Sequence, residues 1–186
     1  QEVSLFQTVQ KGDQGFFVRP QIVQTLTYLR GIDIQRYLRE LNAFFSQPIR
    51  YHLRHLVFMW FGQQTNLIDQ EKTIGLSHLQ SSEDRRLFLL GARGNTEWFD
   101  VIQSRMDDLL TLPDQALNEE LIPFLRSIQE YRSDEVFNIL AKQIDKSEIW
   151  NKRIIWCLNS YKSWNSKEAE KCLLWFCENG ESPWYS

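Results

Sequence analysis

A succession of amphipathic helical patterns, each preceded by a capping residue, constrains the fold of this chain most strongly. Between Ile34 and Phe45 the apolar residues recur three or four positions apart, which places them on one face of a helix. Asp33 precedes this segment and is suited to accept a backbone N–H as its N-cap. Pro48 suits the first turn of the next helix, which becomes apolar nearly all round near Trp60. These patterns predict an all-α fold.

Polar residues divide the rest of the chain into further helices. Gly62 and Gly94 suit the left-handed conformation that often follows the last residue of a helix. Pro123 lies inside an apolar helical pattern, which predicts a kink or a late start there. N-caps are expected at Ser81 or Ser82, Asn95, Ser133, Ser147 and Ser166.

The predicted helices form pairs with a regular spacing. The first helix of each pair is expected to begin at about residues 33, 66, 96, 134 and 167, a period of about 34 residues. Antiparallel helix pairs at such a period are typical of an α-solenoid of the HEAT or TPR kind. The units share this rhythm without shared consensus residues, so a compact helical bundle is the alternative. We predict a helical-repeat domain over residues 20–186.

Residues 1–19 have a different character. Val3–Gln10 and Gly15–Val18 are β-capable runs on either side of a Lys-Gly-Asp-Gln turn, which predicts a short N-terminal β-hairpin. The alternative is a loose tail left by truncation. Because the chain opens at Gln1 without an initiator Met, we expect it to be a fragment of a longer protein.

Composition and charge point to a cytoplasmic location. No apolar run reaches the roughly 20 residues that span a bilayer. Cys157, Cys172 and Cys177 lie in apolar helical patterns, as expected of reduced thiols in a core. The net charge of −3 divides into +3 over residues 1–62 (seven basic, four acidic) and −6 over residues 63–186 (fourteen basic, twenty acidic). This balance is not basic enough to indicate nucleic-acid binding by itself.

Sequence motifs for catalysis are missing. No phosphate-binding loop with Gly-Lys-Ser/Thr and no glycine-flanked serine occurs. His52 and His55 are three positions apart on one helix, but His78 is the remaining histidine, and a metal site needs three or four ligands. The acidic pairs at 107–108 and 119–120 are expected on solvated helix faces. We therefore predict that the chain is not an enzyme and holds no cofactor or metal.

Four arginines are the candidate partner-binding residues. Arg36 and Arg39 are three positions apart on one predicted helix, and Arg50 and Arg54 are four apart on the next. A short connection makes these helices antiparallel, so the two pairs form a broad, weakly positive face suited to an acidic protein partner. The alternatives are ordinary surface charge, with Arg36 or Arg39 paired to neighbouring acids, and a nucleic-acid-binding face.

Tryptophan is concentrated near the end of the chain. Five of the seven tryptophans lie in the last 37 residues: Trp150, Trp156, Trp164, Trp175 and Trp184. We expect them in the core between helices, with Trp184 as the candidate for exposure.

The N-terminal segment LFQTVQKGDQGFFVRPQIVQTLTYLRG resembles the junction of STAND-type NTPases, a class that includes the NACHT proteins. In that family the wing of a winged-helix domain leads into a helix, and an α-solenoid sensor follows. The resemblance implies that GFFVRPQ is the last wing strand and QIVQTLTYLR the junction helix. It further implies a non-catalytic interaction or sensor module of a larger, NTP-regulated signalling protein. The expected partner is then another protein or the missing domains of the same chain, and a nucleic-acid-binding helical module is the alternative.

Overall fold

The computed structural model describes residues 4, 5, 7, 18–47, 51–159 and 166–179. Every regular element in these ranges is a helix, which confirms the all-α prediction. The predicted hairpin lies largely outside the described residues. Val18, which was expected to end its second strand, instead begins a helix.

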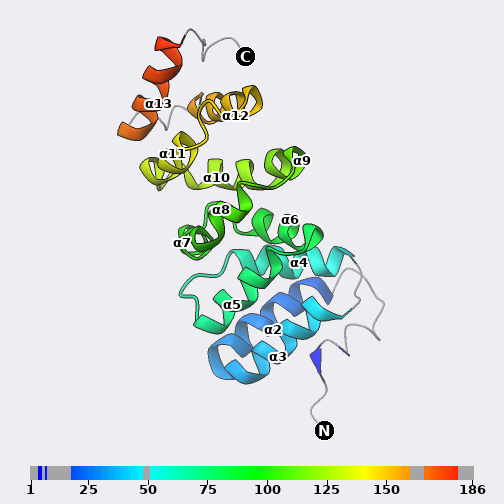
Figure 1. Cartoon of the computed structure of the whole chain (residues 1–186). Helices are drawn as coiled ribbons and strands as arrows, with labels where there is room; N and C mark the ends of the chain where they lie inside the picture. The colour runs from blue at the N-terminus through cyan, green and yellow to red at the C-terminus, as the bar shows by residue number, and fades with distance from the viewer. Residues whose placement is uncertain (1–3, 6, 8–17, 48–50, 160–165, 180–186) are drawn as a thin grey trace.

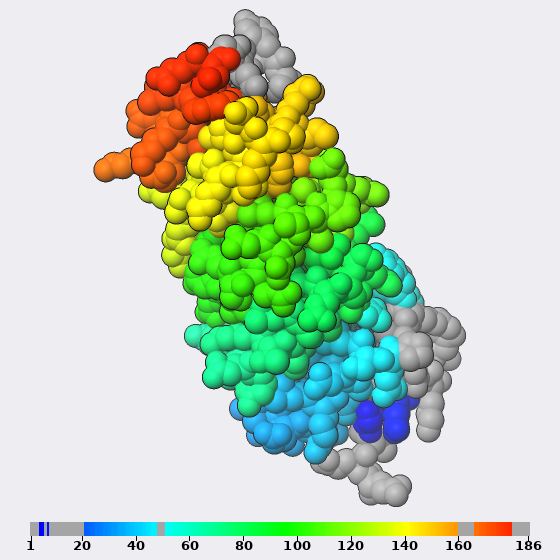
Figure 2. Space-filling view, in the orientation of Figure 1, coloured from blue at the N-terminus to red at the C-terminus, as the bar shows by residue number. Residues whose placement is uncertain are grey.

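The helices follow one another along the molecule in chain order, as Figure 1 shows. They are α2 (Val18–Ile32), α3 (Ile34–Ser46), α4 (Tyr51–Gly62), α5 (Asp69–His78), α6 (Ser82–Gly91), α7 (Thr96–Ile102), η1 (Gln103–Arg105), α8 (Met106–Leu109), α9 (Asp114–Ala116), η2 (Leu117–Leu121), α10 (Ile122–Ile128), α11 (Ser133–Ala141), α12 (Glu148–Leu158) and α13 (Lys167–Glu178). The space-filling view in Figure 2 shows the same order as successive bands of colour along an elongated body.

Two rows of helices run along this body. Helices α5, α7, α11 and α13 lie along one side, and α4, α6, α9 and α12 along the other (Figure 1). Within the second row α4 contacts α6, which contacts η2, and within the first row α5 contacts α7 and α11 contacts α13. Helices α2, α4, α5 and α11 therefore pack against α4, α6, α7 and α13 respectively, in addition to contacts between sequence neighbours such as α2 and α3.

The spacing of side-chain hydrogen bonds shows the same pattern. Between described residues, these bonds join partners that are six or fewer positions apart or 28 to 41 positions apart. Examples at 33, 35 and 32 positions are Trp60 to Thr27, Arg85 to Glu120 and Ser166 to Asp134. Each helix pair is thus joined to the pairs before and after it. The first helices of the pairs begin at residues 34, 69, 96, 133 and 167, within three residues of the prediction.

Most of the predicted N-caps are confirmed. The side chains of Asp33, Ser81, Asn95, Ser147 and Ser166 each accept a backbone N–H two or three positions further on. The prediction for Ser133 is wrong, because this residue is the first of α11 and makes no capping bond. Its hydroxyl oxygen is buried without a hydrogen-bond partner.

Where a kink or a late start was predicted at Pro123, the structure has a widened turn within a continuous helical path. Helix α10 begins at Ile122 and is preceded by the π-helical turn η2, in which the N–H of Ile122 donates to the carbonyl oxygen of Leu117. Proline has no N–H to continue a regular ladder and its ring clashes with the carbonyl four positions back. Widening the preceding turn by one residue accommodates Pro123 without ending the helical path.

Glycine has two different roles in this chain. Gly94 has a φ of 76° after the end of α6, which confirms its predicted left-handed conformation. The same prediction for Gly62 is wrong, because Gly62 is the last residue of α4 and its φ is not positive. A Cβ atom on Gly62 would lie 2.3 Å from the carbonyl carbon of Gly91, and one on Gly91 would lie 2.4 Å from the carbonyl oxygen of Phe58. Helices α4 and α6 therefore touch backbone to backbone.

An aromatic cluster surrounds this crossing. Trp98 of α7 is fully buried, its ring lies edge-on to Phe88 at 4.9 Å between centroids, and its indole N–H donates to the carbonyl oxygen of Phe61. Gly75 of α5 leaves the room that the Trp98 ring occupies, because a Cβ there would lie 2.4 Å from the ring. In the core of three successive helix pairs, large aromatic rings thus lie beside glycines, which leave room for them.

We predict that Gly62→Ala lowers the free energy of unfolding by about 2 kcal/mol or more, because the new methyl group forces apart two helix backbones. Urea unfolding followed by circular dichroism measures this. Gly31→Ala is the matched control, since Gly31 lies in α2 with nothing within 4 Å of the added Cβ. That change should leave stability equal or higher by up to about 1 kcal/mol. Equal stability of the Gly62→Ala variant and the original chain would contradict the close crossing.

Candidate functional site

The arginines predicted to form one face are placed differently from one another. Arg39 is exposed on α3, Arg36 is half-buried on the same helix, and Arg50 lies outside the described residues. Asp33 and Glu40, the acids expected to pair with the α3 arginines, accept hydrogen bonds from groups other than those guanidiniums. Asp33 accepts the backbone N–H of Arg36, and buried Glu40 accepts from the hydroxyl of Ser4 and from a backbone N–H.

Arg54 is directed toward the next helix pair. Its guanidinium forms an ion pair with Asp84 of α6 and lies over the ring of Phe58 at 5.9 Å from the centroid. Its Nε atom is buried without a hydrogen-bond partner. Arg54 therefore joins α4 to α6. Among the described residues, the predicted arginine face keeps exposed Arg39 and half-buried Arg36.

A fully buried carboxylate joins three elements near the N-terminal end. Glu71 of α5 accepts two hydrogen bonds from the guanidinium of Arg30, at 2.8 and 3.0 Å, and one from the hydroxyl of Tyr37 at 2.6 Å. It also accepts the backbone N–H of Ile68 at 3.0 Å, which caps its own helix. The hydrogen bond with Glu71 raises the pKa of Arg30, and burial together with Glu71 raises the pKa of Tyr37.

Comparable pairs recur further along the chain. Arg85 of α6 donates to Glu120 of η2 at 2.6 Å, and both side chains are buried. The expectation that Glu120 is solvated is therefore wrong. Arg153 of α12 donates to Asp114 and Asn118 at 2.8 and 2.7 Å. These ion pairs and hydrogen bonds join residues 35 to 41 positions apart, and no local sequence pattern indicates such a distant partner.

The histidines do not form a metal centre in the described part of the chain, where no three His, Cys, Asp or Glu residues are placed to hold one ion. His52 and His55 are half-buried on α4. His78 is buried at the end of α5, between the rings of Phe45 and Phe58 at 4.3 and 4.9 Å. Its Nδ1 lies 3.4 Å from a carboxylate oxygen of Asp84, and its Nε2 has no partner.

The cysteines are partly as expected. Cys157 and Cys172 are buried, and burial raises the pKa of their thiols to about 12 and about 11. These thiols are protonated and unreactive at neutral pH. Cys177 is exposed, so its predicted place in the core is wrong.

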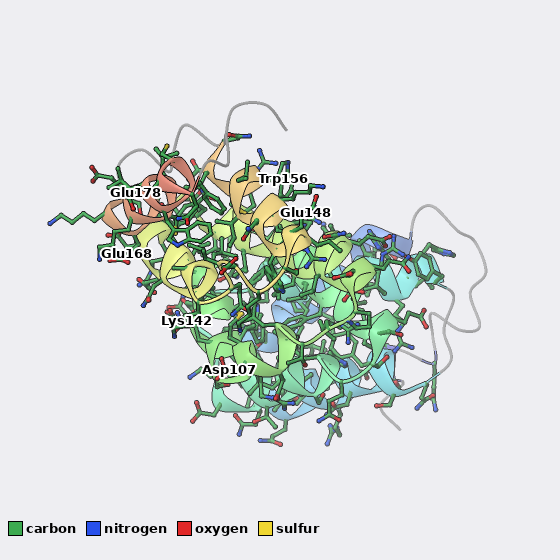
Figure 3. The ribbon with its side chains drawn as sticks, turned by 45° about the horizontal axis from the view of Figure 1, so that its top comes forward. Asp107, Lys142, Glu148, Trp156, Glu168 and Glu178 are labelled. Carbon is green, nitrogen blue, oxygen red and sulfur yellow. The ribbon has the colours of Figure 1, made fainter. Side chains whose placement is uncertain are left out.

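The prediction that the C-terminal tryptophans fill the core is wrong for Trp156. Trp150 is buried and Trp175 is half-buried, whereas Trp156 is 42% exposed on α12; Trp164 and Trp184 lie outside the described residues. The guanidinium carbon of Arg126 lies 4.1 Å from the centroid of the Trp156 ring. Figure 3 shows Trp156 at the outer edge of α12, on a different side of the molecule from Asp107 and Lys142.

Shallow grooves lie between neighbouring helices. One of about 420 Å³ lies between α6 and η2 and is lined by Arg86, Pro113 and Glu119 among others. Another of about 450 Å³ lies along α4 and is lined by Tyr51, His52, His55, Leu56 and Met59. Both surfaces are open, the first of mixed character and the second mostly apolar, which suits contact with a macromolecule better than enclosure of a small substrate.

Comparison of the chain with protein-family models, with curated proteins and with solved structures finds no match. Among the helices in the described ranges, none combines the length and the apolar character that crossing a bilayer requires.

We predict that Arg54→Glu lowers the free energy of unfolding by about 3 kcal/mol or more, because it sets a second carboxylate against half-buried Asp84. Arg39→Glu, on an exposed position of the neighbouring helix, should change stability by about 0.5 kcal/mol or less. Chemical unfolding of both variants measures the difference. Similar free energies of unfolding for the two variants would show that the Arg54–Asp84 ion pair does not stabilise the fold.

We predict that His78 makes the chain less stable as the pH falls. Burial lowers the pKa of His78 in the folded state, opposed in part by Asp84 and reinforced by Arg54. Below about pH 6.5 the unfolded chain therefore binds a proton at this position that the folded chain does not. The free energy of unfolding should fall by up to about 1.4 kcal/mol per pH unit as the pH drops from 7 toward 5.

The variant His78→Phe should flatten this dependence, while His52→Phe, at a half-buried position, should retain it. Urea unfolding at a series of pH values provides the comparison. A pH dependence in His78→Phe as steep as in the original chain would refute the assignment.

Proposed function

We propose that this chain is a non-catalytic helical-repeat module of the α-solenoid type, which binds another protein or other domains of a larger, NTP-regulated signalling protein. The observation that carries the proposal is the spacing of its cross-links, which join each helix pair to the next at 28 to 41 positions. Chains built in this way grow by extension, so they present long exposed surfaces rather than one enclosed pocket.

The exposed surface offers anchors for a protein partner. Several large apolar side chains are between 42% and 65% exposed: Tyr28, Ile32, Tyr51, Tyr131, Ile149, Trp156 and Leu174. Aromatic residues are enriched in protein interfaces, where their rings supply much of the buried area. Their distribution over several repeats supports a partner that contacts more than one helix pair.

Charge supports an acidic partner at the N-terminal end. Residues 1–62 carry +3, and exposed Arg39 and half-buried Arg36 lie there on α3, while residues 63–186 carry −6. A weakly positive surface of this kind steers an acidic protein toward it. Because Arg54 is paired with Asp84, the positive charge at this end is spread rather than concentrated. A spread charge supports a protein partner over nucleic acid.

The link to STAND-type NTPases rests on the N-terminal sequence resemblance, whereas the proposed cytoplasmic location rests on the three cysteines as reduced thiols. The segment QIVQTLTYLR, which the resemblance assigns to a junction helix, lies within α2. Most of the preceding wing segment lies outside the described residues. We therefore propose the association from the order of elements, a helix at this junction followed by paired helices.

The proposal is tested by charge reversal at a position that does not affect folding. The tagged chain is used to purify binding proteins from cell extract at low and high salt, and Arg39→Glu is compared with Arg86→Glu, an exposed arginine on α6. We expect a stoichiometric protein whose recovery falls with salt and with Arg39→Glu but not with Arg86→Glu.

Duplex DNA and RNA are tested in parallel by fluorescence anisotropy at about 0.15 M salt. Tight binding that Arg39→Glu abolishes would replace the protein-partner proposal with the nucleic-acid one. Recovery of no stoichiometric protein, with no nucleic-acid binding, would refute the interaction role.

A further inference from the structure

Arg126 and Trp156 form a stacked pair on the surface where α10 meets α12. The guanidinium carbon lies 4.1 Å from the centroid of the indole, which is the geometry of a close cation–π contact. One turn further along, the side chain of Gln129 donates to the carbonyl oxygen of Cys157 at 3.1 Å, and both residues are buried. The two helices are thus fixed beside the stack, which holds the guanidinium plane in place.

The guanidinium of Arg126 has unused donors. Arg126 is exposed and makes no hydrogen bond or ion pair with any residue that the structure describes. In contrast, Arg30, Arg54, Arg85 and Arg153 each donate to a carboxylate of a neighbouring repeat. An arginine has five N–H donors arranged in a planar fork that matches a carboxylate. Because stacking already restricts its rotamers, Arg126 loses less entropy when it binds one.

Apolar surface lies beside these donors. Ile149 and Trp156 are 45% and 42% exposed on the same helix, seven positions apart, which places them on one face of α12. Lys152 lies between them, and its ammonium group is paired with Glu148 at 2.6 Å. Figure 3 shows Glu148 and Trp156 on this side of α12. The surface thus offers one free positive group next to two exposed apolar side chains.

We propose that Arg126 and Trp156 form an anchor for a short peptide segment of a protein partner, one that carries a single carboxylate side chain beside an apolar side chain. Arg126 binds the carboxylate through its free donors, and the apolar side chain lies against Trp156 and Ile149. Exposed Glu119, which lies seven positions before Arg126, would repel a continuous polyanion such as nucleic acid. This inference rests on the proposed interaction role but concerns a surface other than Arg39.

Selection of random peptides by display on the intact purified chain tests the proposal. We expect the selected peptides to contain Asp or Glu beside an apolar residue. Their affinities, measured by fluorescence anisotropy with synthetic peptides, should weaken about tenfold or more in Arg126→Gln and in Trp156→Leu. Arg39→Gln, another exposed arginine, should bind them as the original chain does. Thermal unfolding of each variant checks the fold, and Arg126→Gln decides the outcome if Trp156→Leu is unfolded.

Three results would overturn the anchor: no peptide binding, selected peptides without acidic residues, or unchanged affinity in Arg126→Gln. The experiments can refute the Arg126–Trp156 anchor and the wider interaction role independently of each other. A partner recovered from extract that depends on Arg39, together with peptides indifferent to Arg126, removes the anchor and leaves the interaction role. Loss of both signals removes both.

Discussion

The structure depends on one constraint, which is that successive helix pairs bury their apolar faces against one another. The side-chain hydrogen bonds between pairs obey this constraint, since they join partners such as those 32 to 35 positions apart. Ion pairs with a buried carboxylate, such as Glu71–Arg30 and Arg85–Glu120, lie at these junctions. Such pairs add little net stability over apolar packing, but removing one partner is costly because it leaves a buried charge unpaired. These ion pairs therefore determine the alignment of neighbouring helix pairs more than the stability of the contact between them.

Close backbone contact and aromatic filling occur side by side where α4, α5, α6 and α7 meet. Gly62 and Gly91 let α4 and α6 touch, while Trp98 fills the space beside Gly75. Both arrangements need a specific residue at a specific position, because interiors are packed at nearly the density of organic crystals. The outward faces are free of this demand, and the residues proposed for binding, Arg39 and the Arg126–Trp156 pair, lie there.

Local features of the fold were predictable from sequence because they depend on neighbouring residues. The N-caps at Asp33 and Ser166 and the stop at Gly94 follow from short-range hydrogen bonding and from the conformational freedom of glycine. The site was less predictable because it depends on contacts a repeat away. Nothing near Arg54 in sequence indicates Asp84, nothing near Glu120 indicates Arg85, and the exposure of Trp156 depends on how α10 and α12 meet.

Native-state hydrogen exchange of Arg85→Met tests whether each helix pair is coupled mainly to its neighbouring pairs. This change leaves Glu120 buried without its partner at a junction in the middle of the chain. The account predicts faster exchange in α6, η2 and α10, a smaller effect in α4 and α11, and rates close to the original in α2 and α13. An equal acceleration of every helix would mean that the chain opens as one cooperative unit, which would contradict the account.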